Sequence, residues 1–400
     1  MNANEKNILR VTCYGHFLSH FNMLVFPAVL IPLSEKLQLS LVETLSLSFW
    51  MYLLFGVSAL PWGMLADKVS KRVLLLIFYG GAGFCGLLAA SAMDNAFYLG
   101  LALTGVGLFS GIYHPVGLGW IAGEIENTSM AMGFNGMFGN LGLATAPLVA
   151  GLINYGFGLQ AVYLAVGILN ILGIVLLVRT RKNDHSVSSQ RQDNQSNTSF
   201  IPFGVLLVAM MLGGIVYRGT SVTLPAYFQL SNQGLFNSIS HLFGGIGTEN
   251  VVATLVTSII YLLGMAGQFV GGKVGGKYDL RRSYFLFHLI TIPAAIAMAF
   301  TSNLPLIGFA MIHSFFLLGM QPIENTLVSR LAPPGLMSSA YGLKFILTFG
   351  VGALSVKVIE VVKSSYGFPI IYLVLATVSV FLVGAILILM VRTAPLRVSG

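Results

Sequence analysis

The residues of this sequence that could carry out chemistry are a few ionisable side chains inside long apolar runs. Each costs roughly 2.5 to 3.5 kcal/mol in a membrane even on the most lenient insertion scale, so each is a candidate functional residue. They are His16, His20, His114, Arg218, His313, Glu324 and Lys344. Histidine exchanges protons near neutral pH, and arginine can hold an anion with a permanent charge. The set therefore indicates proton transfer and anion binding in an apolar environment.

The histidines of the N-terminal half are predicted to lie close together. His16 and His20 are four residues apart, so they share one helix face, about 6 Å apart along the axis. Counted from the predicted cytoplasmic ends of their helices, both lie roughly as deep as His114, at about 12 to 18 Å. We interpret all three as substrate-binding residues, and His20 and His114 also as proton carriers. The alternative is that each is a hydrogen-bonded packing residue.

The charged residues of the C-terminal half are expected to divide into a pair and an anchor. Glu324 is the one carboxylate clearly inside an apolar run, and Lys344 has a similar predicted depth. A Glu324–Lys344 ion pair would neutralise both, either as a proton-coupling device or as a structural pair. Arg218 then needs an anionic ligand or another buried partner. Tyr14, Tyr113 and Tyr217 lie next to or near His16, His114 and Arg218, respectively, in the sequence. Together these residues predict a net basic, aromatic substrate site.

The sequence offers little for catalysis. HExxH, GxSxG and comparable motifs do not occur in it, and Cys13 and Cys85 both fall in apolar runs. We therefore expect no enzyme activity, no cofactor and no metal site, although the three histidines would be the candidates for one.

The elements that position these residues are predicted from composition. Only 8% of the 400 residues are charged and 56% are hydrophobic, whereas about a quarter of a soluble chain is charged, which excludes a soluble protein. Runs of about 20 apolar residues can cross a bilayer, and we count twelve. They cover residues 8–33, 44–66, 73–92, 96–122, 130–153, 158–178, 203–230, 251–272, 283–301, 304–330, 338–362 and 366–391.

Basic residues predict the orientation of the spans, because they concentrate in cytoplasmic loops. Three of the 21 fall outside (Lys36, Lys357 and Lys363), two lie within spans, and sixteen fall inside when both termini are cytoplasmic. The net charge of +8 thus reflects topology and requires no nucleic acid. The polar stretch 179–202 has the composition of a linker, which predicts domains 1–178 and 203–400.

The two halves are expected to form a repeat of six helices each. The matched positions are His20 with Arg218, His114 with Gln321, and Asn135 with Lys344, at offsets of 198, 207 and 209. The fold class is therefore an all-α membrane protein of two pseudo-symmetric six-helix bundles.

The loop after the second span contains Gly63, Asp67, Lys68, Lys71 and Arg72. This spacing resembles the loop signature of the major facilitator superfamily, where it implies a gating role for these residues. The resemblance also implies a central cavity lined by the first, fourth, seventh and tenth spans. A degenerate copy follows the eighth span, with Gly276 where the Asp would stand.

The fifth span carries Gly133, Gly142, Ala146-Pro147 and Ala150-Gly151. It resembles the antiporter signature of proton-coupled drug exporters, which implies that Gly142 and Pro147 take part in gating. The alternative is a generic face of small residues for helix packing.

Tyr14 to Asn22, Ile112 to Pro115, and Gly139-Asn140-Leu-Gly142 are similar to the fosmidomycin-resistance group of that superfamily. The group usually has acidic residues where this chain has His20 and Val116, so both departures remove negative charge.

We therefore predict a monomeric secondary transporter in the bacterial inner membrane that exports a small anionic or amphipathic compound in exchange for protons. An importer of an organic anion is the alternative. A non-transporting sensor is a third, although the loops are too short for a soluble output domain.

Overall fold

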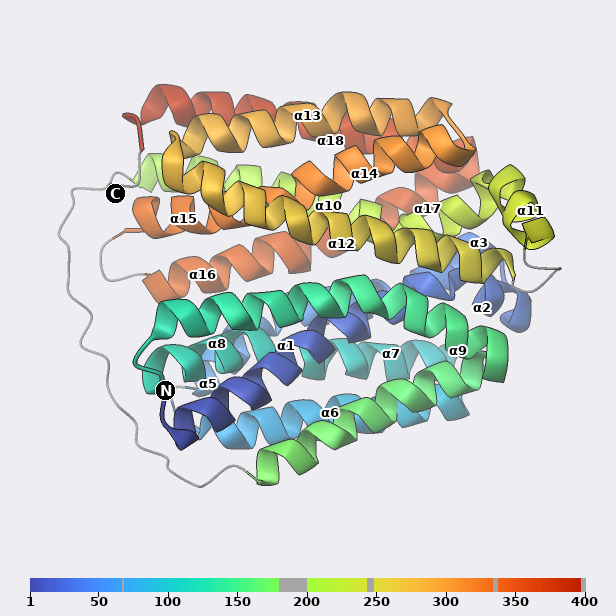
Figure 1. Cartoon of the computed structure of the whole chain (residues 1–400), viewed down its shortest axis with the longest axis horizontal. Helices are drawn as coiled ribbons and strands as arrows, with labels where there is room; N and C mark the ends of the chain where they lie inside the picture. The colour runs from blue at the N-terminus through green and yellow to red at the C-terminus, as the bar shows by residue number, and fades with distance from the viewer. Residues whose placement is uncertain (67, 180–199, 243–247, 334–336, 397–400) are drawn as a thin grey trace. The chain divides into compact units, whose positions relative to one another are not determined.

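The computed structural model describes residues 1–66, 68–179, 200–242, 248–333 and 337–396, and every regular element within them is a helix (Figure 1). The chain divides into two compact units, Met1–Arg191 and Gln192–Gly400. The division falls within the predicted linker, most of which lies outside the described residues. The two units are described in turn.

The first unit contains nine helices among its described residues. They are α1 (Ala3–Ala28), α2 (Leu30–Leu37), α3 (Leu41–Ser46), α4 (Phe49–Val57), α5 (Ala59–Ala66), α6 (Lys71–Ser91), α7 (Ala96–Ser110), α8 (Tyr113–Glu124) and α9 (Thr128–Val178). Local capping explains several starts: Asn2 and Glu5 form a capping box on α1, and the Asn95 side chain accepts from the first backbone N–H groups of α7. Such caps satisfy N–H groups that have no partner within the helix.

The second unit has a similar order of elements. They are α10 (Phe200–Ser231), α11 (Gln233–Leu242), α12 (Glu249–Lys277), α13 (Leu280–Phe300), α14 (Asn303–Gly319), α15 (Gln321–Leu331), α16 (Met337–Phe345), α17 (Leu354–Tyr366) and α18 (Phe368–Arg392). A π-helical turn, Ile346–Gly350, and a 3-10 turn, Val351–Ala353, join α16 to α17.

Corresponding helices have corresponding neighbours in the two units. In the first unit α6 packs against α7 and α9, and α4 packs against α7. In the second, α13 packs against α14 and α18, and α12 packs against α14. This recurrence is the arrangement expected of the predicted six-helix repeat.

The count of spans differs from the predicted twelve at two places. Among the described residues, ten helices are long and apolar enough to cross a membrane, or eleven if α1 and α2, bent by 54°, form one span. The predicted spans 130–153 and 158–178 both fall in α9, whose apolar part of 49 residues is about 74 Å long, more than twice a hydrocarbon core. Gly158 interrupts it with φ 81° and ψ 173°, so the helix turns there and not at residues 154–157.

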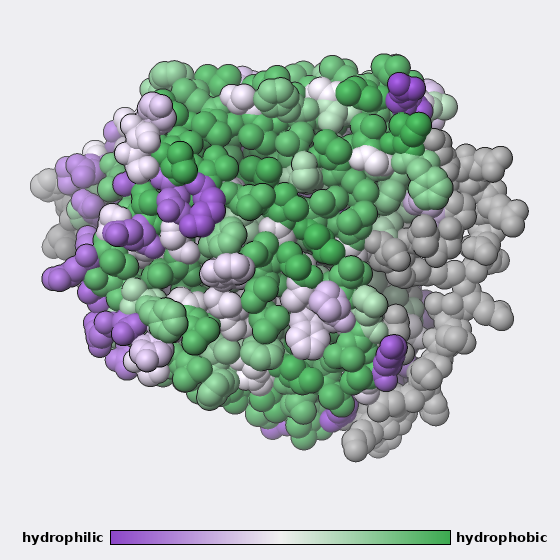
Figure 2. Space-filling view, turned by 180° about the vertical axis from the view of Figure 1, so that it is seen from behind, coloured by the Kyte–Doolittle hydropathy of each residue, from purple (hydrophilic) through white to green (hydrophobic). Residues whose placement is uncertain are grey.

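Twelve crossings and cytoplasmic termini remain predictions. The apolar surface agrees with a lipid environment, because large hydrophobic side chains such as Phe97 (73% exposed), Phe157 (82%) and Val391 (84%) face outward. Figure 2 shows one face of the molecule on which apolar residues predominate. In water, exposed apolar area of this extent would cause aggregation.

Candidate functional site

The three histidines of the first unit form one cluster. His16 and His20 lie on α1, and their Nε2 atoms are 3.2 Å apart. The His114 ring, near the start of α8, lies 5.3 Å from the His16 ring and 5.2 Å from the His20 ring, centroid to centroid. The predicted contact among these residues is therefore confirmed.

Asn135 on α9 joins the cluster through hydrogen bonds to His16 and Tyr113. Its backbone carbonyl and its Oδ1 lie 2.9 and 2.8 Å from Nδ1 of His16. The hydroxyl of Tyr113 and the side-chain amide of Asn135 also hydrogen bond, and the Tyr113 ring stacks on His16 with centroids 5.1 Å apart. His16 is thus fixed by hydrogen bonding and stacking, and both His16 and His20 are partly exposed.

The backbone explains how α8 and α9 bring their residues to α1. The helix that begins with α7 breaks at Gly111-Ile112, and Pro115 in the next turn has no N–H to donate to the residue four positions earlier. The break sets His114 at the second residue of α8. On α9, a Cβ at Gly139 would come within 2.5 Å of the His16 ring, so the absence of a side chain there makes the space that His16 occupies.

A second buried polar network lies in the same unit. The Asn22 side-chain amide donates to Ser110 Oγ at 3.0 Å, and Asn22 and Asn170 exchange hydrogen bonds. This network joins α1, α7 and α9. Because its amides are satisfied by one another, we interpret it as structural.

Arg218 lies in the second unit, on α10, and is 2% exposed. Its guanidinium carbon lies 5.9 Å from the centroid of the Tyr217 ring, a distance at which a cation is attracted by the aromatic face. Tyr217 is itself buried. Two of the predicted substrate-binding residues are therefore adjacent in space as well as in sequence.

The predicted Glu324–Lys344 ion pair is confirmed. Lys344 Nζ on α16 lies 2.8 Å from Glu324 Oε1 on α15, and both side chains are buried. The Tyr284 hydroxyl on α13 donates to the other carboxylate oxygen at 2.8 Å, and Lys344 also donates to Asn325. Extra hydrogen bonds of this kind are what a buried ion pair requires to offset its desolvation.

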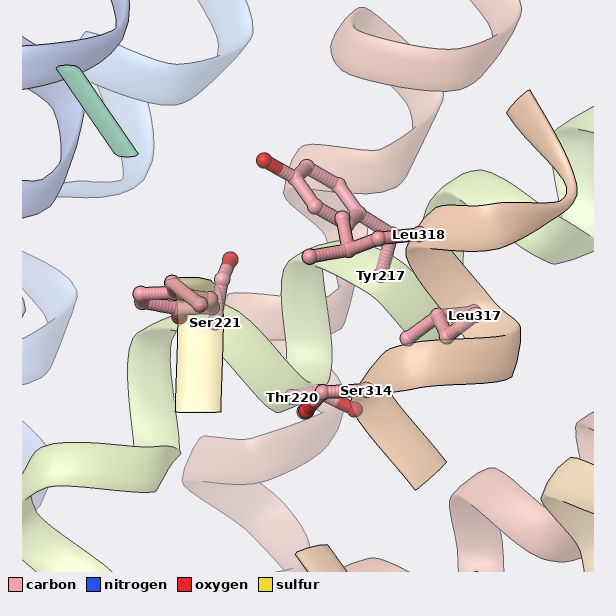
Figure 3. A pocket seen from close by; sticks show the side chains of 7 residues that line it. Tyr217, Thr220, Ser221, Ser314, Leu317 and Leu318 are labelled. Carbon is pink, nitrogen blue, oxygen red and sulfur yellow. The ribbon is translucent and has the colours of Figure 1, made fainter. Parts of the chain in front are cut away.

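A small hollow lies between α10 and α14. Tyr217, Thr220 and Ser221 of α10 face Ser314, Leu317 and Leu318 of α14 across it (Figure 3). Its interior of about 10 Å³ has room for roughly one water molecule. His313, one residue from Ser314, is within 3.2 Å of Thr220 Oγ1, so a polar strip runs along this contact of α10 with α14.

The remaining predicted residues lie apart from these clusters. Tyr14 donates to the Leu169 carbonyl at 2.7 Å, so its hydroxyl is directed at α9 and not at the histidines. Gly142 lies where α9 crosses α1, and a Cβ there would be 2.2 Å from the Phe17 carbonyl oxygen. Pro147 lies within α9.

The predicted gating loop is described only in part. Asp67 lies outside the described residues. A Cβ at Gly63 would lie 3.3 Å from Pro115 Cβ, the Arg72 guanidinium donates to the Val178 carbonyl at 3.2 Å, and Lys68 is exposed. Lys71 Cε would lie 3.9 Å from a Cβ at Gly119. Both Gly63 and Lys71 thus face α8, the helix that carries His114.

Sequence reasoning missed Asn135 and Tyr284 as site residues. A signal for Asn135 existed, because the repeat aligns it with Lys344: both anchor the polar cluster of their own unit. Tyr284 offers no comparable signal, since a tyrosine in an apolar run is an ordinary core residue. Together the two clusters provide titratable groups in one unit, and a buried permanent cation and a neutralised ion pair in the other.

Comparisons with known proteins agree with this architecture. The family model described as Major Facilitator Superfamily matches residues 12–356. Among solved structures, the nucleoside transporter NupG is 15% identical, with a TM-score of 0.73 over 97% of this chain and 100% of its own. At that identity the likeness concerns the fold.

Two relatives of this chain are named for different transport functions. The "Multi-drug resistance efflux pump PmrA" of Streptococcus pneumoniae is 23% identical over an alignment of 391 positions, and the match covers 92% of each chain. The "Probable L-galactonate transporter" of Escherichia coli is 27% identical over an alignment of 268 positions, and the match covers 58% of this chain and 57% of its own.

Proposed function

Because the chain belongs to the major facilitator superfamily, and is therefore a multi-pass membrane transporter and not an enzyme, we propose that it is a proton-coupled exporter. Its cargo is a small anionic or amphipathic organic compound, moved by alternating access. The membrane is the bacterial inner membrane, and the working form is a monomer.

Three observations support export. The relative that covers 92% of this chain is named an efflux pump, and α9 carries the antiporter-like pattern around Gly142 and Pro147. The motifs of the fosmidomycin-resistance group in α1, α8 and α9 support the same direction. Transport direction still depends on the gradients and on the affinities of the two access states.

The cluster of His16, His20 and His114 carries the proposal of proton coupling. Histidine as a residue type exchanges protons near neutral pH, and the three imidazoles are in mutual contact, so a proton can pass from one ring to the next. The predicted first span, residues 8–33, contains no carboxylate that would do so instead. Glu324, with Lys344, is the other candidate carrier.

An importer of a sugar acid is the second candidate. The relative named a probable L-galactonate transporter favours it, because a galactonate is a small organic anion with one carboxylate, which suits Arg218.

Sealed proteoliposomes distinguish the two directions. The purified protein is first screened by thermal shift against a panel of organic anions that includes L-galactonate. The stabilising compound is then followed across the liposome wall with the pH gradient imposed in either sense. A proton antiporter accumulates cargo on the acidic side, whereas a proton symporter accumulates it on the alkaline side. Absence of gradient-driven accumulation in both senses would contradict proton coupling.

Arg218 supplies the test of anion binding. Arg218→Lys keeps the charge but loses the planar fork that holds a carboxylate or phosphate by two hydrogen bonds, so we expect weaker binding. Arg218→Gln should nearly abolish it. Titration calorimetry with the stabilising anion measures both, and circular dichroism with thermal unfolding controls for the fold. Full affinity in folded Arg218→Gln would show that the arginine is structural.

A further inference from the structure

We infer that His16, His20 and His114 form a binding site for a divalent transition-metal ion of the zinc class. This goes beyond the proposed function, since the ligand is neither the proton nor the organic cargo. It revises the sequence-based expectation that the chain has no metal site.

The spacing of the nitrogen atoms supports the site. Zinc–nitrogen bonds of about 2.05 Å at the tetrahedral angle set two ligand nitrogens about 3.3 Å apart. The Nε2 atoms of His16 and His20 are 3.2 Å apart. One nitrogen from each of the three rings lies within 4.8 Å of the others, so the third ligand needs to move by at most about 1.5 Å to reach the same geometry. That movement is within the range of a side-chain rotation.

The hydrogen bonding of His16 fixes the tautomer that a metal ligand needs. Nδ1 of His16 lies 2.9 Å from the backbone carbonyl oxygen of Asn135 and 2.8 Å from its Oδ1. Both are acceptors, so Nδ1 carries the proton of the neutral ring and Nε2 presents its lone pair. Metal-binding histidines usually have such an outer partner, which orients the ring and raises its basicity. Nε2 of His16 is the atom that faces His20.

The donor set selects the kind of ion. Imidazole suits zinc, nickel, cobalt and copper, whereas magnesium and calcium require carboxylate or carbonyl oxygens. Three histidines provide three of four tetrahedral ligands and leave one position for water or an anion. His16 and His20 are only partly buried and His114 is buried, so an ion can approach from the side of α1.

Zinc binding by the purified full-length protein tests the inference without substrate or gradient. With any affinity tag removed, equilibrium dialysis should give one tight zinc per chain, and thermal unfolding should shift upward with zinc but not with magnesium. His20→Gln and His114→Gln should each lose that ion. Asn135→Ala should weaken it by roughly tenfold to a hundredfold, the usual effect of removing an outer partner.

His313→Gln is the matched control, because His313 is also buried in a helix and hydrogen bonded but lies in the other unit. It should bind zinc as the wild type does. If His114→Gln unfolds, His16→Gln and His20→Gln replace it. Equal zinc stoichiometry and affinity in the wild type and all cluster variants would overturn the site, as would no tight zinc in the wild type. Either result leaves the transport proposal untouched, since the transport assays in proteoliposomes are run with a chelator present.

Discussion

The surroundings of Glu324 favour a structural role for this carboxylate. A buried carboxylate in a membrane protein is tolerated when a cation and further donors compensate it. Here Lys344 and the Tyr284 hydroxyl both lie 2.8 Å from its oxygens. The pair is therefore neutral overall and well hydrogen bonded. Replacing one partner should change the stability of the protein differently from replacing both.

Removing one partner should destabilise the protein more than removing both. Lys344→Met leaves Glu324 buried without its cation, which costs about 3 to 5 kcal/mol for buried pairs. The double variant Lys344→Met/Glu324→Gln should recover most of that loss. Thermal unfolding in detergent measures the three proteins. If the double variant is as unstable as the single one, the ion pair does not hold these helices together.

The identity of the charged and histidine residues could be predicted from the sequence, because ionisable side chains are rare in apolar runs. Their hydrogen-bond partners could not. Asn135 and Tyr284 are common residue types in a span, and only the packing of α9 on α1, and of α13 on α15, brings them to His16 and Glu324.

At the scale of elements, helix breaks position the site. The chain was predicted to cross once at residues 96–122 and once at 304–330, yet each of these spans is two helices, with breaks before Tyr113 and Gln321. Pro115 and Pro322 explain why a break occurs, since neither can donate a backbone hydrogen bond. Hydropathy alone averages over such breaks. For the same reason it cannot report the length of α9 or its turn at Gly158.

The crossing of α1 and α9 depends on a small residue at 142. A methyl group on Gly142 would meet the Phe17 carbonyl oxygen at 2.2 Å, and this backbone atom cannot move without shifting α1. We expect Gly142→Ala to cost about 1 to 3 kcal/mol, as overpacking usually does, and to slow transport. Thermal unfolding and liposome assays measure the two effects.

Gly136→Ala is the control for this change on the same helix, because nothing lies within 4 Å of the Cβ position at Gly136. Alanine favours a helix over glycine by up to about 1 kcal/mol, so Gly136→Ala should be neutral or slightly stabilising. Equal behaviour of the two variants would argue against the close crossing.

The start of α13 is hydrogen bonded to the end of α18 and to the segment that follows it. Asp279 caps α13, forms an ion pair with Arg281 at 2.9 Å, and accepts from the Leu396 backbone N–H at 2.9 Å. Arg281 also donates to the Met390 carbonyl at 3.1 Å. Although burial raises the pKa of Asp279, the hydrogen bonds from Arg281, Arg282 and Leu396 outweigh it, and the net pKa lies below the ordinary 3.8.

This contact should show a defined pH dependence. A lowered pKa means that the folded state favours the charged carboxylate, so its stabilisation is present above pH 3.8 and is lost as the pH falls through the folded-state value. Asp279→Ala should lower stability by about 0.5 to 2 kcal/mol near neutral pH, as loss of a helix cap does. Thermal unfolding measured from pH 7 to 3 should show that the difference in stability between the wild type and Asp279→Ala becomes smaller in acid. A difference in stability that becomes larger in acid would contradict the lowered pKa of Asp279.

At the scale of the whole molecule, the repeat relates two chemically different clusters. Matched positions hold His20 and Arg218, and Asn135 and Lys344. One unit thus carries three histidines, a residue type that usually exchanges protons near neutral pH, and the other carries a permanent cation and an ion pair. In transporters built from repeats, cargo and coupling ions bind at the interface of the repeats. We therefore propose that the two units have different roles, in which the first responds to protons and the second holds the anion.

This division predicts how coupling fails when the histidines are replaced. An unperturbed histidine gains a proton at roughly pH 6 to 7, so if His20 and His114 carry the proton, gradient-driven transport by the wild type should change over that interval. His20→Gln/His114→Gln should lose accumulation against a gradient and this pH response, yet keep exchange of cargo down its own gradient, because Arg218 still binds the anion. Lys344→Met/Glu324→Gln should keep accumulation, since its groups are structural in this scheme. Both are measured in proteoliposomes at matched protein content, with a chelator present to exclude metal effects. If the histidine double variant still accumulates cargo and the Glu324 variant does not, the proton is carried by Glu324, and the histidine cluster has another role.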